Sequence, residues 1–524
     1  MDVVLVSTYA QSVALGLRYI SAYLKRAGHK VTIVFMASKR ETAEVDYSPP
    51  LLADFVHHCR SADVIGMSLM TNTYYRAKAL TEALRAGGVQ APIVWGGTHA
   101  TVAPRESAEV ADYVCIGEGE KAMVDFAAAL DGGGDPAATA NLAHLKNGDL
   151  HTNKPYPLAD DLNEYPFPDY DLEDHWITEK DALVPVADHP KLLRGALRRY
   201  RILSTRGCPF SCSFCNNATQ MRIYREAGSM QNWVRKRSVE SIVGELESIC
   251  ARYPSIKEVN IVDDLFLVRS EDEVDAFVEA YRRRINLPIE LDAFPSTVSQ
   301  AKVASLSRLP LKLISMGIQS GSRDTLFTMY NRPTPVEMVA RAIRIISDQG
   351  LRAEYHYLVA NPFETEESMV ETLRFAADHH RGPAKLRIFP LQLFPGSAMH
   401  ERARKEGVID EHHDDAYRGS YAGKKHIMRA HYLEIWLRIV LGLRNAGVPQ
   451  RMVHKVIDFA LSRPGRWLLD RSWFPPASFY VYRVSRVLFK NLLYRPVIAP
   501  IMSRRQRRDR RRREASVKAL GQPA

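Results

Sequence analysis

Short apolar runs alternate with helical patterns over the first 120 residues of the chain. Runs such as Val3-Val4-Leu5-Val6 predict buried strands. Between the runs, apolar side chains recur every three or four residues, as in Leu17, Ile20 and Leu24, and predict helices. Strands that alternate with helices predict a doubly wound parallel sheet. The five expected strands lie at 3–6, 31–34, 63–68, 92–97 and 113–117.

The same alternation resumes near residue 200, with longer helical segments between the strands. Six βα units predict a barrel or partial barrel whose reactive groups line the carboxyl ends of the strands. After Gly407 the alternation stops, and only helical patterns follow, at 428–443, 449–461 and 479–494. The six expected barrel strands lie at 201–205, 258–262, 289–294, 312–318, 353–359 and 386–393.

The expected fold class is therefore α/β, with a doubly wound parallel sheet, a partial barrel and a helical C-terminal cap. A length of 524 residues agrees with two or three domains. We expect a ligand-binding domain at 1–140, a linker rich in Pro and Asp at 141–195, the partial barrel at 196–410, a helical segment at 411–500 and an Arg-rich disordered tail at 501–524.

Positive charge is concentrated at the C-terminal end. The chain has a net charge of +11, and residues 504–513 alone contribute +7, which leaves +4 for the rest. This distribution argues against a nucleic-acid groove in the folded domains. The first residues do not resemble a signal peptide, and no run of 18 apolar residues occurs. We therefore expect a cytoplasmic protein.

The loop after the first barrel strand carries three cysteines, Cys208, Cys212 and Cys215, at spacings of four and three residues. Thiolates are the ligands of iron–sulfur clusters, and three of them leave one iron of a four-iron cluster open to a non-protein ligand. Structural zinc is the alternative, but it normally requires four closed Cys or His ligands, and no His lies near this loop. Three clustered cysteines without a secretory signal also suit a reducing compartment better than a disulfide.

The motif Cys208-x3-Cys212-x2-Cys215, with the aromatic Phe214 before the last cysteine, resembles the signature of the radical S-adenosylmethionine (SAM) superfamily. The resemblance implies a (β/α)6 partial barrel and a [4Fe–4S] cluster held by the three cysteines. It implies that the open iron binds the amino and carboxylate groups of SAM. The reduced cluster then cleaves SAM to a 5′-deoxyadenosyl radical, with electrons from a flavodoxin- or ferredoxin-type donor.

Other barrel positions match the superfamily's SAM contacts. Asp263 or Asp264, after the second strand, matches an acidic residue that holds the SAM amino group; a carboxylate acid/base pair and a solvated turn are the alternatives. The remaining positions implied to bind SAM are Phe214, Gln319, Ser320 and Asn361.

Glycine pairs follow the fourth and fifth strands of the first domain, at the sheet edge where doubly wound folds bind ligands. The domain resembles the cobalamin-binding domain that precedes one large subclass of radical SAM enzymes. The loop at 8–16 lacks the Asp-x-His-x-x-Gly motif that supplies a lower cobalt ligand in many cobalamin proteins, and His99 fits loop structure better than ligation. Cobalamin is therefore expected without a histidine below cobalt. The implied contacts are Gly16, Ser68, Gly96, Gly97, Gly117, Glu118 and Gly119.

Strand alternation adds four candidates for catalysis or substrate binding. Glu290 and Asp292 share one face of the third barrel strand, and Glu354 and His356 share one face of the fifth. Because helices cover the barrel exterior, these polar faces are expected to point into the lumen. His356 could exchange a proton near neutral pH, and an interior hydrogen bond is the alternative role.

These observations predict a cobalamin-dependent radical SAM enzyme. The resemblance implies methyl transfer to an unactivated carbon, here of a small or lipid-like metabolite. In that scheme one SAM methylates cobalamin, a second supplies the radical, and methylcobalamin donates the methyl group. A radical cyclase or oxidoreductase with the same cofactors is an alternative. A non-catalytic cobalamin sensor is disfavoured by the intact cysteines and by Asp263 and Asp264.

The C-terminal segment suggests a membrane contact. In 479–490 the basic residues Arg483, Arg486 and Lys490 fall on one helical stripe among apolar neighbours. A basic amphipathic helix of this kind can lie in a membrane interface, here at the inner face, followed by the Arg-rich tail. The alternative is that the apolar face packs on the barrel and the tail is solvated.

Overall fold

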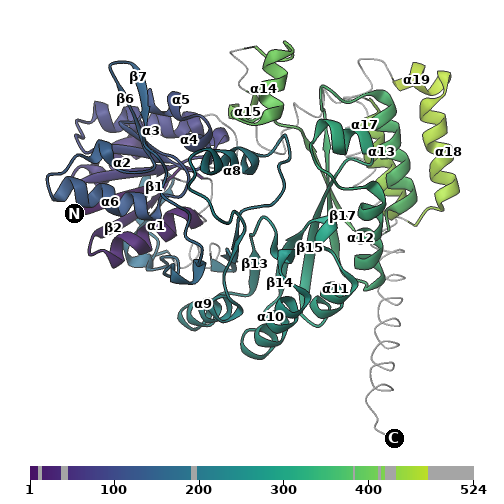
Figure 1. The fold of residues 1–524 in the computed structure, drawn as a ribbon, viewed down its shortest axis with the longest axis horizontal. Helices are drawn as coiled ribbons and strands as arrows, with labels where there is room; N and C mark the ends of the chain where they lie inside the picture. Colours follow the sequence, from purple (N-terminus) through teal and green to yellow (C-terminus); the bar gives the residue numbers. More distant parts are fainter. Residues whose placement is uncertain are drawn as a thin grey trace, which may run out of the picture.

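The computed structural model describes residues 1–9, 14–36, 45–189, 197–381, 384–410, 415–418, 432–445 and 447–469. Two sheet-containing domains lie side by side, and the C-terminal helices pack at the far end of the second domain (Figure 1). The helical pattern at 479–494 and the Arg-rich tail lie outside the described residues.

The first domain is built on a parallel sheet that confirms all five expected strands. Val3 and Leu5 belong to one core and Val4 and Val6 to another, because alternate side chains point to opposite faces. Helices cover both faces, which explains the continuous apolar strands. The strands are β1 (Asp2–Ser7), β2 (Lys30–Phe35), β3 (Val64–Ser68), β4 (Ile93–Gly96) and β5 (Tyr113–Cys115). The helices are α1 (Leu15–Arg26), α2 (Pro49–Cys59), α3 (Tyr74–Ala86), α4 (Thr98–Val102), α5 (Pro104–Ala108) and α6 (Glu120–Asp131).

The segment 141–195, which we expected to be a linker, instead completes the first sheet. The order of the nine-stranded sheet is β7-β6-β5-β4-β3-β1-β2-β8-β9, so this segment covers both edges of the five-stranded core. Covering the edges satisfies backbone groups that β2 and β5 would otherwise expose. The added strands are short and partly exposed, and their sequence signal is weak. They are β6 (Leu142–Lys146), β7 (Asp149–Thr152), β8 (His175–Glu179) and β9 (Ala182–Pro185).

The second domain contains six parallel strands in sequence order, and its first and last strands do not pair with each other. This arrangement confirms the expected partial barrel. The strands are β10 (Arg199–Ile202), β13 (Glu258–Ile261), β14 (Ile289–Ala293), β15 (Leu311–Gln319), β16 (Ala353–Val359) and β17 (Lys385–Pro390). The helices between them are α9 (Val239–Arg252), α10 (Glu271–Arg284), α11 (Gln300–Leu306), α12 (Val336–Asp348) and α13 (Glu366–His379).

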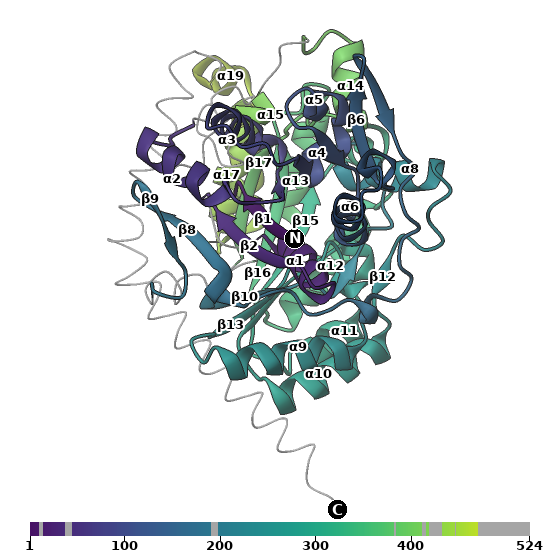
Figure 2. The same ribbon diagram turned by 90° about the vertical axis from the view of Figure 1, so that its left-hand side faces the viewer.

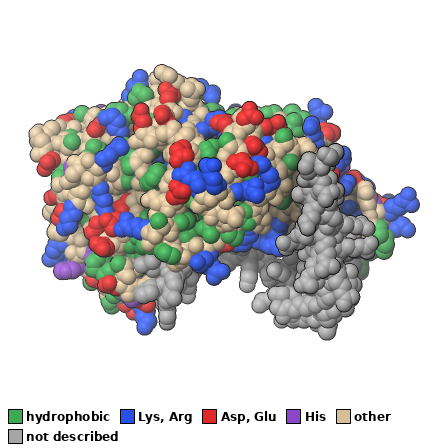
Figure 3. Space-filling view, turned by 90° about the horizontal axis from the view of Figure 1, so that it is seen from below, with side chains coloured by type: hydrophobic (Ala, Val, Ile, Leu, Met, Phe, Trp, Pro, Cys, Tyr) green, Lys and Arg blue, Asp and Glu red, His purple; other side chains and the backbone are tan. Residues whose placement is uncertain are grey.

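Helices α9, α10 and α11 lie side by side on the outer face of this sheet (Figure 2). Ser270 begins α10 with a capping box that includes Glu273, which is why the helix starts there. From below, acidic and basic side chains are interspersed over this face (Figure 3). Salt bridges such as Arg284 to Glu240, at 2.8 Å, account for part of this pattern.

Smaller elements complete the second domain and the C-terminal segment. A two-stranded ribbon and one helix flank the cysteine loop: β11 (Thr205–Arg206), β12 (Arg235–Lys236) and α8 (Asn216–Glu226). The C-terminal helices α17 and α18 pack on α13, and they confirm the helical patterns expected near 428–443 and 449–461. The helices after the barrel are α14 (Ala398–Lys405), α15 (Asp415–Arg418), α17 (Tyr432–Asn445), α18 (Gln450–Leu461) and α19 (Arg463–Leu469).

Candidate functional site

The three cysteines of the barrel loop lie together. Gly207 turns the chain into the loop with φ of +87°, and a side chain there would meet the Trp233 carbonyl oxygen at 2.1 Å. Burial is the main cause that raises the pKa of Cys208 to about 11 and that of Cys215 to about 12, and the nearby Asp264 and the neighbouring thiols contribute to both rises. The loop therefore brings three thiols to one place, as the spacing predicted.

The arrangement fits a cluster better than a single ion. Among the described residues, no three His, Cys, Asp or Glu side chains converge closely enough to hold one metal ion. Thiolates of a four-iron cluster each bind a different iron and stand farther apart than the ligands of one zinc. The donor set suits an iron–sulfur cluster.

Arg332 adds a positive charge beside the thiols, and sequence reasoning missed it. The buried guanidinium contacts Cys212, lies 3.9 Å from the Phe294 ring centroid, and donates to the Gly317 carbonyl oxygen at 2.6 Å. Its Nε has no hydrogen-bond partner. A buried cation here would offset the negative charge of a thiolate-bound cluster. No local pattern marks this residue, because it reaches the cysteines only through the tertiary fold.

The structure separates the two neighbouring aspartates. Asp263 is buried and accepts hydrogen bonds from Ser204 N and Ser204 Oγ, both at 2.5 Å, and from Thr205 N at 3.0 Å. Its carboxylate is therefore satisfied within the protein, which favours a structural role for Asp263 over the predicted SAM contact. Asp264 is exposed, hydrogen-bonds to Asn217, and lies close to Cys208. Asp264 is therefore the better placed of the two for the predicted SAM contact.

A cavity of about 370 Å³ opens beside Cys215, and we call it the cluster cavity. Phe214, Gln319 and His356 line it from the barrel. Gln319 has φ of +70° at a β-bulge, an unfavourable backbone conformation of the kind found at functional sites. Asn216 also lines the cavity, and its buried Oδ1 has no hydrogen-bond partner. The cavity therefore offers an unsatisfied acceptor to a ligand.

The first domain forms the opposite wall of the cluster cavity, through Met70, Thr71 and Thr98. Met70 and Thr71 follow β3, and Thr98 follows β4, at the sheet edge where doubly wound folds bind ligands. A ligand on that edge would therefore face the cysteine loop across one cavity.

Two other predicted SAM contacts lie elsewhere. Ser320 is buried, and its hydroxyl hydrogen-bonds to that of Thr372 at 2.9 Å. Asn361 is also buried, and its Oδ1 accepts a hydrogen bond from Phe363 N at 3.0 Å. Neither residue lines the cluster cavity. Both stabilise loops at the strand ends in this structure, and their SAM contacts stay predictions.

The four residues expected in the barrel lumen, Glu290, Asp292, Glu354 and His356, do not all lie at the same level along the barrel axis. His356 lines the cluster cavity, and its Nε2 lies 3.0 Å from Glu354 Oε1. Asp292 is open to the lumen near both groups, and desolvation raises its pKa.

Glu290 does not belong to this group. It is buried near the beginning of β14 and pairs with Lys312 at 3.1 Å and Arg199 at 3.4 Å. Both partners lie at or near strand starts, at the end of the barrel away from the cysteines. These salt bridges favour a structural role for Glu290 over the predicted catalytic one.

A second cavity, of about 360 Å³, penetrates the first domain, and we call it the glycine cavity. A Cβ added at Gly16 would meet no atom within 4 Å, so the backbone there borders open space. Leu203, Arg206 and Gln220 of the second domain also contribute to its wall. The cavity is lined by all seven residues predicted to contact cobalamin: Gly16, Ser68, Gly96, Gly97, Gly117, Glu118 and Gly119.

No histidine is among the described residues that line the glycine cavity. His99 is fully buried outside it, with Nδ1 3.2 Å from Thr71 Oγ1 and its ring 5.1 Å from that of Tyr74. Burial lowers the pKa of His99 to about 4, so the imidazole is neutral at pH 7. His99 is a core residue in helix α4 and not the loop residue that we expected.

Glu118 lines the glycine cavity and is the centre of an ion cluster. Its carboxylate pairs with Arg235 and with Arg206 at 3.3 Å, and accepts a hydrogen bond from the Tyr165 hydroxyl at 3.0 Å. Burial opposes ionisation, but the two guanidinium groups lower the pKa of Glu118 to about 2. Arg206 stands two residues before Cys208, so this ion cluster ties the glycine cavity to the cysteine loop.

Comparisons with known proteins agree with this architecture. Residues 1–127 match the B12 binding domain model, and residues 202–376 match the radical SAM superfamily model. The cobalamin-dependent SAM radical enzyme OxsB with aqua-cobalamin bound has a similar fold, with a TM-score of 0.66 at 15% identity over 95% of this chain and 81% of that one. The radical SAM methyltransferase TsrM from Kitasatospora setae gives a TM-score of 0.60 at 18% identity over 77% and 76%.

Two relatives are similar in sequence. An uncharacterized methyltransferase from Pyrococcus horikoshii is 25% identical over 60% of this chain. The anaerobic magnesium-protoporphyrin IX monomethyl ester cyclase of Rubrivivax gelatinosus is 24% identical over 69% of this chain. The matches span 64% and 61% of the lengths of these relatives, less than two thirds of either.

The chain is therefore a radical SAM enzyme with an N-terminal B12-binding domain. Its cofactors are cobalamin, a [4Fe–4S] cluster and SAM. The residues present fit them: the glycine cavity suits cobalamin, and the three thiols beside Arg332 suit the cluster. The individual SAM and cobalamin contacts stay predictions.

Proposed function

We propose that this enzyme transfers a methyl group to an unactivated carbon of a small-molecule or lipid-like substrate. The observation that carries the proposal is the cluster cavity. Its wall is formed by Thr71 and Thr98 on the side of the predicted cobalamin site, and by Cys215 and His356 on the side of the predicted cluster. A substrate in this cavity would meet both cofactor sites at once. The methyltransferase similar to this chain supports the same reaction.

Bound cobalamin and SAM would supply the methyl group and the radical. The protein's own part is to bind and orient. Asp264 is available to accept hydrogen bonds from the SAM amino group, and the Asn216 Oδ1 offers a second acceptor. The Glu354 carboxylate fixes the orientation of the His356 ring in the cavity wall. We propose that an external flavodoxin- or ferredoxin-type protein reduces the cluster.

Radical ring formation is the second candidate, because a cyclase is also similar to this chain. Anaerobically reconstituted enzyme, incubated with SAM carrying a trideuteromethyl group and with metabolites of its own host, distinguishes the two. Methyl transfer places the label in a new product. A new product without the label, formed together with 5′-deoxyadenosine, would instead establish the cyclase or oxidoreductase reaction.

We predict that His99→Ala leaves the lower face of cobalt unchanged. His99 lies outside the glycine cavity, with Tyr74 and Tyr417 rings at 5.1 and 5.5 Å. Electron paramagnetic resonance of the bound Co(II) form should show no nitrogen splitting from the protein in either enzyme. Nitrogen splitting that disappears in His99→Ala would make His99 a ligand after all.

We also propose that the C-terminal segment contacts an anionic membrane surface. Within the described residues, no helix is both long and apolar enough to cross a bilayer. Met452, Phe459 and Trp467 are exposed on α18 and α19, ahead of the basic segment. Clustered cations near an anionic leaflet gain about 1 kcal/mol each.

Liposome flotation tests the membrane contact. Full-length protein should float with anionic vesicles at low salt, and protein truncated before Ser478 should stay in the soluble fraction. Recovery of both proteins in the soluble fraction would exclude the contact and leave the alternative of a packed helix with a solvated tail.

A further inference from the structure

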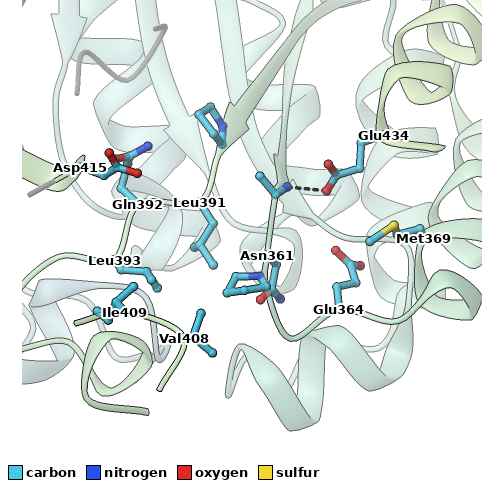
Figure 4. A pocket seen from close by; sticks show the side chains of 13 residues that line it. Asn361, Glu364, Met369, Leu391, Gln392, Leu393, Val408, Ile409, Asp415 and Glu434 are labelled. Carbon is cyan, nitrogen blue, oxygen red and sulfur yellow. Dashed lines mark hydrogen bonds between the residues drawn. The ribbon is translucent and has the colours of Figure 1, made fainter. Parts of the chain in front are cut away.

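A third cavity lies at the outer edge of the partial barrel, and we call it the edge cavity (Figure 4). It has a volume of about 400 Å³. Segments 360–364 and 390–393, which follow β16 and β17, form two of its walls. Glu434, from helix α17 of the C-terminal segment, forms part of a third. The cavity thus lies where the barrel meets the C-terminal helices.

The edge cavity and the cluster cavity share a wall. Pro390, Leu391 and Gln392 line both of them. The wall is a single chain segment leaving β17, so a molecule lodged in the edge cavity would have one end beside the cluster cavity.

The lining of the edge cavity combines an apolar surface with acidic groups. Leu391, Leu393 and Ile409 supply apolar surface. Figure 4 shows the side chains of Glu364 and Glu434 on the other side. Within the described part of the chain, the lining contains carboxyl and amide groups and lacks Lys, Arg and His. Such a surface favours a ligand that brings hydrogen-bond donors or positive charge.

Gln392 independently indicates a ligand. The residue is only 8% exposed, and its amide, which has no hydrogen-bond partner among the described residues, borders both cavities. An amide placed in a cavity wall in this way can both donate hydrogen bonds to a ligand and accept them from it. Because Gln392 lines both cavities, that ligand would extend along the shared wall.

Glu364 has room for a cationic partner. Its carboxyl accepts a hydrogen bond from Thr325 Oγ1 at 3.1 Å, and its neighbours there are hydroxyl groups rather than cations. Burial raises the pKa of Glu364 to about 7, and a positive charge placed beside the carboxylate would oppose that rise. Glu434 is held in place because its carboxylate accepts a hydrogen bond from the Ala360 backbone N–H.

We propose that the edge cavity anchors a substrate with an apolar body and a protonated amine. The ammonium group binds the carboxylate of Glu364, and the rest of the molecule runs past Gln392 toward the cluster cavity. That this ligand is the substrate rests on the proposed function. That the cavity binds an apolar amine does not depend on it. A ligand with a carboxylate in place of the amine would add a like charge and be rejected.

Two probes of similar shape and opposite charge test the inference. Phenethylamine and 3-phenylpropionate are titrated into reconstituted full-length enzyme at pH 8, and binding is followed by ligand-observed nuclear magnetic resonance. The amine should bind at least about tenfold more tightly than the acid, as expected for one charge-assisted hydrogen bond. Glu364→Gln should remove most of that preference, and Gln392→Leu should weaken amine binding. Glu401→Gln is the matched control, since Glu401 is an exposed carboxylate on α14 that does not line the cavity.

Equal binding of amine and acid, or an unchanged preference in Glu364→Gln, would overturn the inference. Thermal melting checks that each variant is folded. If Glu364→Gln does not fold, the effect of Gln392→Leu on amine binding tests the inference instead. Loss of methyl transfer with intact amine binding would refute the proposed reaction alone. Intact methyl transfer to a substrate that lacks an amine would refute the anchoring role alone.

Discussion

Replacing Cys208, Cys212 or Cys215 with alanine is expected to abolish SAM cleavage in each case. Each thiol is predicted to hold one iron of the cluster, and a cluster with two protein ligands cannot keep the geometry that binds SAM. Formation of 5′-deoxyadenosine from SAM and dithionite should fall by more than about 1,000-fold, as when one member of a catalytic unit is removed. Iron analysis and the visible spectrum should show loss of the cluster.

Cys250→Ala is the matched control for the three cysteine variants. Cys250 lies on α9, half-buried against the apolar core of the domain, and behaves as a small hydrophobic side chain. The variant should keep its cluster and its SAM cleavage. A cluster lost in Cys250→Ala but kept in Cys208→Ala would contradict the ligand assignment.

The second large effect separates two adjacent residues. Asp263→Ala should cost roughly 3–5 kcal/mol of the free energy of unfolding, because it leaves the buried Arg269, 4.0 Å away, without its carboxylate partner. Asp264→Ala should leave that free energy almost unchanged, since Asp264 is exposed, but should strongly reduce SAM cleavage. Urea unfolding of the two variants and 5′-deoxyadenosine formation measure the two effects. A stable Asp263→Ala enzyme that has lost SAM binding would reverse the assignment.

Sequence patterns predicted the sheet cores well because burial on both faces leaves continuous apolar runs. They failed at β6 to β9, where short strands are partly exposed and carry polar side chains. Two strands are added at each edge of the sheet, and this is a tertiary effect that no local sequence pattern predicts.

The candidate site was predictable only where the chemistry is local. The three cysteines share one loop, so their spacing was sufficient. Alternation identified the strand face of Glu290 but not its height along the barrel, which its salt bridges with Arg199 and Lys312 determine. Asp263 and Asp264 are adjacent in sequence, and only the backbone around Ser204 decides which one turns inward.

The strands formed after residue 140 decide how short an N-terminal fragment can be and still keep the edges of its sheet covered. Ile33, Val34 and Phe35 of β2 pair with residues 175–177 of β8. A fragment ending at residue 140 would expose this apolar strand as a bare edge, and bare edges template pairing between molecules. A fragment continuing through β9 would keep the edge covered. An N-terminal fragment made for separate study should therefore end near residue 189 and not after helix α6.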